Sequence, residues 1–332
     1  MKCDTPIYIF QEAVIQMTKR VAYCYALLTR FYELLRSKFK VPTSRSVIKI
    51  GGYIIKMYND ANECAYECGV LLEVGLSNSI TFKVPKIFKL LKIRARSALV
   101  MEYVTGHNLG NYILDFLLHK NSDAVRIFYR LGRAIRELHN LNLSGLHNSR
   151  LPSSCLELKQ GIVELSKKLV ALKIIDNNLF DAISDILKKA DVVNKIFLPC
   201  NLHGELYFTH ILVQDNTIVL FDFHNAQRGA SYFDLAMLSI SLYVSLTFPP
   251  QALKRFTPLI EAFLKGYYGK DLNAEIIKSM RLAELYIALR EILVCAKTLH
   301  AKVSLITSFL AMLKIKRLKV AIKEVILPKL IS

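Results

Sequence analysis

The chain has 332 residues, of which 53% are hydrophobic, and it carries a formal net charge of +18 at pH 7. This length accommodates two modest domains or a single bilobal one, with enough apolar material for a buried core. The seven cysteines are scattered without metal-type clustering, and we interpret them as buried free thiols of a cytoplasmic protein.

Positive charge is concentrated toward both ends of the chain. Over residues 11–40, apolar side chains recur three or four positions apart, which predicts a basic helical extension within residues 1–40. Over residues 297–332, eight Lys or Arg residues stand against the single acid Glu324. Such a bias attracts an anionic partner, either RNA or an acidic lipid surface, although a solvated basic helix face explains it equally well.

The first half of the chain continues with strand signals. Val47–Ile50 and Tyr53–Tyr58 are two β-rich runs around Gly51-Gly52, a pattern typical of a hairpin. A helix is expected at about 61–74, followed by strands near 86–93 and 97–104. This order predicts a small sheet that carries one helix, within a first lobe at residues 41–105.

After residue 105 the pattern is mostly helical, so we expect a second, helical lobe over residues 106–332. Residues 105–109 break the strand pattern and predict a hinge, and Ser122 is expected to cap a helix that ends near His139. Further helices are predicted over 156–190 (two), 233–248, 253–267, 274–300 and 302–327. The weakly charged stretch 235–249 is shorter than the ~20 residues a bilayer requires, so we expect no transmembrane segment.

One polar segment interrupts this helical half between apolar strands. It reads His203-Gly204-Glu205-Leu206-Tyr207-Phe208-Thr209-His210, and a second apolar run, Ile218–Phe221, then ends at Asp222. Packing gives no reason for an acid at that position, so we interpret Asp222 as functional, with a capping role as the alternative. Lys56 likewise stands among apolar residues of a predicted strand, so it either has an acidic partner or faces solvent.

This layout resembles the protein-kinase-like superfamily, in the branch of aminoglycoside phosphotransferases and choline kinases. In that branch the loop reads H-G-D-x-x-x-x-N, whereas here Glu205 and His210 stand at the Asp and Asn positions. Ser231–Ala236 is similar to the family's D-P-x-x-D-L-A segment, and helices inserted before the loop, here over residues 141–199, are typical of the branch. The resemblance, which covers about residues 47–268, implies an α+β, bilobal fold with a small antiparallel-sheet lobe, one helix on that sheet, and a larger helical lobe.

The resemblance implies that ATP is bound between the lobes. Lys56 would hold the α- and β-phosphates, and an acid on the next helix would fix that lysine. Glu67 is the preferred partner because apolar residues follow it at inward-facing spacing, and Glu63 is the alternative. Backbone groups of Glu102 and Val104 would bind adenine, but no glycine-rich loop precedes the hairpin to cover the phosphates.

The same resemblance assigns the chemistry to the second lobe. Asp222 would bind magnesium, since hard cations take carboxylate oxygen, and His210 would stand in for the metal-binding Asn. Imidazole suits zinc, copper or iron better than magnesium, so the alternatives are a single-metal site that uses Asp222 or a site that tolerates manganese. Glu205 would orient the acceptor hydroxyl, although its extra methylene moves the carboxylate by ~1.5 Å. His203 would support the loop, and Asp234 would anchor the loop backbone.

These residues imply a kinase that transfers phosphate from ATP to a hydroxyl group of a small molecule, such as an amino sugar, an amino alcohol or a sugar. Because Glu205 and His210 depart from the family motif, two alternatives stay open. One is a nucleotide-binding pseudokinase that serves as a scaffold. The other is a basic protein, associated with RNA or a membrane, whose kinase-like body is incidental.

Overall fold

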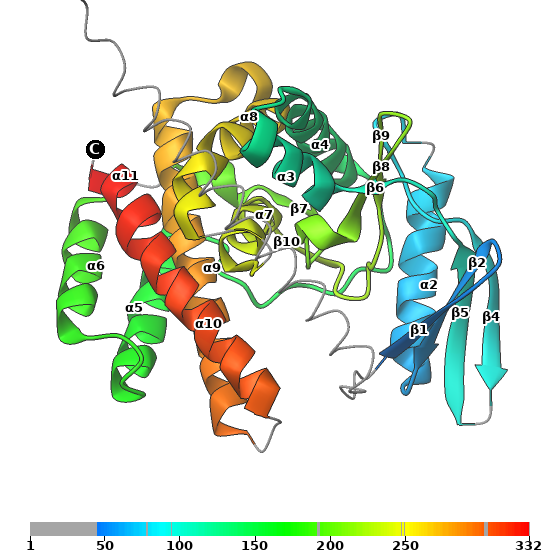
Figure 1. The fold of residues 1–332 in the computed structure, drawn as a ribbon, viewed down its shortest axis with the longest axis horizontal. Helices are drawn as coiled ribbons and strands as arrows, with labels where there is room; N and C mark the ends of the chain where they lie inside the picture. Colours follow the sequence, from blue (N-terminus) through cyan, green and yellow to red (C-terminus); the bar gives the residue numbers. More distant parts are fainter. Residues whose placement is uncertain are drawn as a thin grey trace, which may run out of the picture.

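The computed structural model describes residues 45–77, 79–93, 95–190, 193–246, 248, 250–301 and 305–331. An antiparallel sheet with one helix lies beside a larger, mostly helical part, which confirms the predicted bilobal α+β fold (Figure 1). The helix predicted over residues 11–40 lies outside the described residues.

The smaller lobe is built on four antiparallel strands in the spatial order β1, β2, β5, β4, which span Arg45–Ile50, Tyr53–Tyr58, Arg96–Glu102 and Ile87–Ile93. Gly51-Gly52 forms the turn of the predicted β1–β2 hairpin. Helix α2 (Ala61–Leu76) begins after Asp60, whose side chain accepts a hydrogen bond from the N–H of Asn62. The apolar side chains that α2 buries beside the sheet are Cys64, Cys68, Val70, Leu71 and Val74.

A second sheet contains strands from both sides of the boundary between the lobes. Its spatial order is β3, β9, β8, β6, with bounds Phe82–Lys83, Thr217–Leu220, Ile211–Gln214 and His107–Asn108. Strand β3 pairs in parallel with β9, and β6 pairs antiparallel with β8. Strand β8 begins where the polar segment ends, and β9 ends two residues before Asp222. This sheet therefore holds both parts of the predicted site next to each other.

The larger lobe consists mainly of helices. They are α3 (Leu109–His119), α4 (Asp123–Asn140), α5 (Cys155–Ala171), α6 (Asn177–Lys189), α7 (Tyr232–Val244), α8 (Thr257–Tyr268), α9 (Ala274–His300), α10 (Leu305–Ala321) and α11 (Leu327–Ile331). Shorter elements are the 3₁₀ turns η1 (Asn194–Phe197), η2 (Phe208–His210), η3 (Pro250–Phe256) and η4 (Gly269–Asp271), the π-helical η5 (Ile322–Ile326), and the paired strands β7 (Pro199–Leu202) and β10 (Gln227–Ala230). Every residue of α7 from Tyr232 to Tyr243 is buried, as expected of a helix that is apolar on all sides.

Two details differ from the predictions. Ser122 is the N-cap residue of α4, but its side chain makes no capping hydrogen bond. The preceding Asn121 accepts from the N–H of Asp123 at 2.9 Å instead, because an Asx side chain reaches the N–H two residues on. The helix predicted from residue 253 starts as the 3₁₀ turn η3 and becomes α-helical only at Thr257.

Two glycines allow α4 and α8 to approach closely. A Cβ atom on Gly132 would lie 2.1 Å from the carbonyl oxygen of Phe263, and one on Gly266 would lie 2.0 Å from that of Tyr129. Any side chain at either position would therefore push the helices apart. This contact places His139 of α4 against Tyr267 of α8, where the imidazole Nδ1 lies 2.8 Å from the phenol oxygen.

Several cations of the basic C-terminal segment are used inside the fold. Buried Arg317 donates to the carbonyl oxygens of Tyr243 and Phe248 at 3.0 and 2.6 Å. Lys319 donates to the carbonyl oxygen of Ile174 at 2.8 Å. Part of the positive charge that the sequence concentrates here thus satisfies backbone acceptors. Among the described helices, none is long and apolar enough to cross a membrane.

Candidate active site

The polar segment forms a tight loop between β7 and β8. Gly204 has φ +84°, and a Cβ atom there would lie 1.8 Å from the carbonyl oxygen of Asn225. Glycine is therefore required both by the left-handed backbone and by the close approach of the chain. The loop thus lies directly against the segment that follows Asp222.

Asp234, at the start of α7, holds the loop by its backbone. Its carboxylate accepts from the N–H groups of His203 and Gly204 at 2.7 and 3.0 Å. The imidazole Nε2 of His139 lies 3.1 Å from the same carboxylate, so the acceptor is shared with α4. All four residues are buried, with Asp234 at 0% exposure. The anchoring contact predicted for Asp234 is confirmed.

His203 lies inside the loop rather than in the cleft. Its Nε2 lies 3.0 Å from the carbonyl oxygen of Phe221, which only accepts, so Nε2 carries the proton. Burial lowers the pKa of His203 to about 4 despite the opposing charge of Asp234. The ring is neutral near pH 7 and links the loop to the end of β9, which is a supporting position.

A lysine and two carboxylates connect the lobes. Lys56 of β2 places its Nζ 2.9 and 2.8 Å from the carboxylate oxygens of Glu67 on α2. The same Nζ lies 2.5 Å from Oδ1 of Asp222 in the larger lobe. Glu67 also accepts from the hydroxyl of Tyr58 at 2.5 Å. Of the two acids considered as partners of Lys56, Glu67 makes this contact, whereas Glu63 is exposed on the helix.

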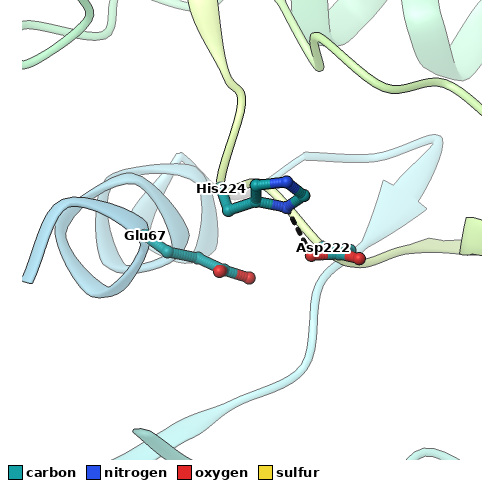
Figure 2. Close-up of side chains that lie close together, drawn as sticks. All are labelled: Glu67, Asp222 and His224. Carbon is teal, nitrogen blue, oxygen red and sulfur yellow. Dashed lines mark hydrogen bonds and ion pairs between the residues drawn. The ribbon is translucent and has the colours of Figure 1, made fainter. Parts of the chain in front are cut away.

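Asp222 lies where the chain turns out of β9. Its φ of +70° is left-handed, a conformation that costs a non-glycine residue free energy and that occurs often at functional sites. Figure 2 shows the side chains of Glu67, His224 and Asp222 close together, with His224 Nδ1 2.7 Å from Asp222 Oδ1. Burial opposes ionisation, but His224 and Lys56 outweigh it and hold the pKa of Asp222 well below its usual range.

Glu205 and His210 face the same carboxylate from the loop. His210 Nδ1 lies 3.0 Å from the carbonyl oxygen of Glu205, and His210 Nε2 lies 3.5 Å from Oδ2 of Asp222. Oε2 of Glu205 lies 3.5 Å from Nε2 of His224. The Glu205 side chain is 29% exposed, so a molecule in the cleft can reach its carboxylate.

Two groups of side chains bring three cation-binding atoms within 4.8 Å of one another: Glu67, Asp222 and His224, and Glu205, His210 and Asp222. Carboxylate oxygens fit a divalent cation such as magnesium or manganese. The predicted metal residues Asp222 and His210 both belong to the second group.

The predicted adenine contacts lie at the end of β5 and just beyond it. The N–H of Glu102 donates to the carbonyl oxygen of Lys86 at 2.8 Å. The N–H of Tyr103 donates to the carbonyl oxygen of Gly52 at 2.9 Å. Among the described residues, none accepts from the N–H of Val104. An N–H group in this linker is suited to a ring nitrogen of a base.

Sequence reasoning missed three residues of this region: Tyr58, His139 and His224. Tyr58 and His139 carry no motif, because their importance comes from packing between distant segments. His224 follows Asp222 by two residues, and that proximity to a predicted metal ligand was the one available signal.

Comparisons with known proteins agree with this geometry. A model of the phosphotransferase enzyme family (APH) matches residues 47–269. A solved structure of aminoglycoside 2'-phosphotransferase-IIIa, a GDP complex, is 15% identical, with a TM-score of 0.58 over 88% of this chain and 98% of that chain. A choline/ethanolamine kinase family protein from Mesorhizobium loti is 13% identical, with a TM-score of 0.56 over 87% and 88%. The search of curated proteins found no match. The chain belongs to the phosphotransferase enzyme family.

Proposed function

We propose that this protein transfers a phosphoryl group from ATP to a hydroxyl group of a small molecule. The observation that carries the proposal is the contact of Lys56 with both Glu67 and Asp222. The ammonium of Lys56 in the small lobe thus lies beside the carboxylate of Asp222 in the large lobe, next to the loop formed by residues 203–210. Phosphoryl transfer depends mainly on positioning and on neutralising the charge of the phosphates, which is the chemistry that such a pair can supply.

The residues divide this work between them. Glu67 and Tyr58 hold Lys56 in place, so that its ammonium can bind phosphate oxygens. Asp222 and His210 would hold a divalent cation, which neutralises phosphate charge when bound. Glu205, partly exposed and held by its own loop, would orient the acceptor hydroxyl and accept its proton. The peptide N–H of Val104 would bind the adenine ring.

Expected acceptors are amino sugars, amino alcohols and related metabolites. This expectation follows the printed names of the similar structures, which include an aminoglycoside 2'-phosphotransferase and a choline/ethanolamine kinase family protein. Cys64, Cys68, Cys155, Cys200 and Cys295 are free thiols, which suits the reducing cytoplasm, where ATP is available.

Nucleotide binding tests the proposal directly. ATP affinity is measured by calorimetry, with magnesium and separately with manganese, for the wild type and for Lys56→Met. We expect the variant to lose at least about tenfold in affinity, roughly 1.4 kcal/mol, because the phosphates lose their ammonium. The matched control is Lys188→Met, since this exposed lysine pairs with the exposed Asp185. Equal ATP affinity of all three proteins, or no binding by the wild type, would refute the proposal.

Turnover then separates an enzyme from a scaffold. ADP release is followed over a panel of amino sugars and amino alcohols, for the wild type and for the double variant Glu205→Asp/His210→Asn. Turnover by the wild type supports the enzyme. The scaffold alternative rests on Glu205 and His210, which stand where the family motif has Asp and Asn. ATP binding without turnover in both proteins would establish that alternative.

A further inference from the structure

The cation site of the cleft has an unusual donor set, and the bonds around its imidazoles indicate which atoms are available. The inference below rests on the proposed function, since it concerns the cation that would accompany the nucleotide. Asp222, His210 and Glu205 bring possible ligand atoms within 4.8 Å of one another, and Oδ2 of Asp222 lies 3.5 Å from Nε2 of His210. The group formed by Glu67, Asp222 and His224 is less suitable. Glu67 already accepts two hydrogen bonds from Lys56 and one from Tyr58.

The hydrogen bond on the far side of His210 fixes which of its nitrogens faces the cleft as an acceptor. Nδ1 lies 3.0 Å from the carbonyl oxygen of Glu205. A carbonyl oxygen only accepts, so Nδ1 donates to it, and Nε2 is the ring nitrogen available to a cation. Nε2 lies 3.5 Å from Oδ2 of Asp222.

His224 contacts Oδ1 of Asp222, the carboxylate oxygen that does not face His210. Its Nδ1 donates to Oδ1 at 2.7 Å, and its Nε2 lies 2.9 Å from the amide nitrogen of Asn225. The carboxylate only accepts, so Nδ1 carries a proton and donates it to Asp222. This bond and the Lys56 contact occupy Oδ1, which leaves Oδ2 directed toward His210. Such outer contacts orient metal ligands and tune their affinity.

We propose that this site binds its divalent cation through nitrogen as well as oxygen, with His210 Nε2 and Asp222 as ligands and His224 as the residue that orients Asp222. Imidazole nitrogen is a poor ligand for magnesium and a good one for first-row transition ions, whereas the carboxylates accept both. The site therefore prefers Mn²⁺ to Mg²⁺. A ligand that replaces an amide oxygen by an imidazole changes the metal preference without removing the site.

Electron paramagnetic resonance of bound Mn²⁺ tests the inference on the full chain, without nucleotide. Metal-free protein is titrated with Mn²⁺, and Mg²⁺ is then added as competitor. We expect Mn²⁺ to bind at least about tenfold more tightly than Mg²⁺, and the pulsed spectrum to show coupling to an imidazole nitrogen. His210→Asn should remove that coupling and weaken Mn²⁺ binding by roughly 10–100-fold. His119→Asn is the control, since that imidazole is exposed and pairs with Asp115.

The outcomes separate this inference from the proposed function. Equal affinity for both ions, or bound Mn²⁺ whose nitrogen coupling survives in His210→Asn, would overturn it. ADP binding in the presence of a chelator is measured on the same samples. Loss of nitrogen coupling in His210→Asn without any nucleotide binding would keep the metal assignment and reject the kinase. Turnover supported by Mg²⁺ as well as by Mn²⁺ would keep the kinase and reject the metal preference.

Discussion

Replacing Asp234 by Asn tests whether one buried carboxylate holds the catalytic loop. Asp234 accepts from the backbone N–H groups of His203 and Gly204 and lies 3.1 Å from Nε2 of His139. Asparagine keeps one acceptor oxygen and turns an N–H₂ group toward at least one of these donors. An unsatisfied buried donor costs about 1–3 kcal/mol, and bonds to a charged acceptor are the stronger kind. We therefore expect the free energy of unfolding to fall by about 2–4 kcal/mol. This is a large part of the roughly 5–15 kcal/mol by which proteins are typically stable.

Urea unfolding of the wild type and two variants measures this loss. Asp234→Asn should lower the midpoint at unchanged slope, and Asp234→Ala should lower it further because all the donors are then left without an acceptor. Asp185→Asn is the control, since this exposed acid pairs with the exposed Lys188, and surface changes of this kind stay within about 0.5 kcal/mol. If Asp234→Asn is as stable as the control, or if Ala is no worse than Asn, the anchoring role is wrong.

Three further changes test other parts of the fold. Gly132→Ala places a Cβ atom 2.1 Å from a carbonyl oxygen of α8, so calorimetry should show a loss of roughly 1–3 kcal/mol or more, as in overpacking. Tyr58→Phe removes a donor to the buried carboxylate of Glu67 and should cost about 1.5–3 kcal/mol in urea unfolding. Burial opposes ionisation of Glu137, but hydrogen bonds from Thr81 and nearby N–H groups lower its pKa below the ordinary 4.5. The ionised carboxylate therefore stabilises the folded state above pH 4.5, and this stabilisation is lost as the pH falls through the lower folded-state pKa of Glu137. The free energies of unfolding of the wild type and of Glu137→Gln should therefore become more similar in acid. A difference that does not change with pH would contradict this account.

The elements of the fold were predictable where the pattern was long and periodic. The β1–β2 hairpin follows from two β-rich runs around a pair of glycines, and α9 was predicted over the residues that form it, 274–300. The short strands β3, β6 and β10 were not predicted. Each has two to four residues, too few for a period, and each exists because a partner strand from a distant segment supplies its hydrogen bonds.

Some residues of the candidate site could likewise be predicted from the local sequence, whereas others depend on contacts between distant segments. Lys56 and Asp222 were found because a charge among apolar strand residues needs a reason, and the contact between them depends on the fold that brings the lobes together. The choice between Glu63 and Glu67 was open in the sequence, because both lie on α2 and only packing decides which one turns inward. His224 was missed because its contact with Asp222 depends on the left-handed backbone at Asp222, and the local sequence does not predict that conformation.

The departures from the family motif are best understood together. In a site that no longer functions, the side chains that replace the family's residues would not be expected to contact one another. Here Glu205 and His210, the two replacements, both contact other residues around Asp222. His210 binds the backbone of Glu205 and faces Asp222, while Glu205 reaches His224, which in turn holds Asp222. Because these side chains contact one another around the same carboxylate, we expect the site to bind a cation still, which the Mn²⁺ titration of the wild type and of His210→Asn tests.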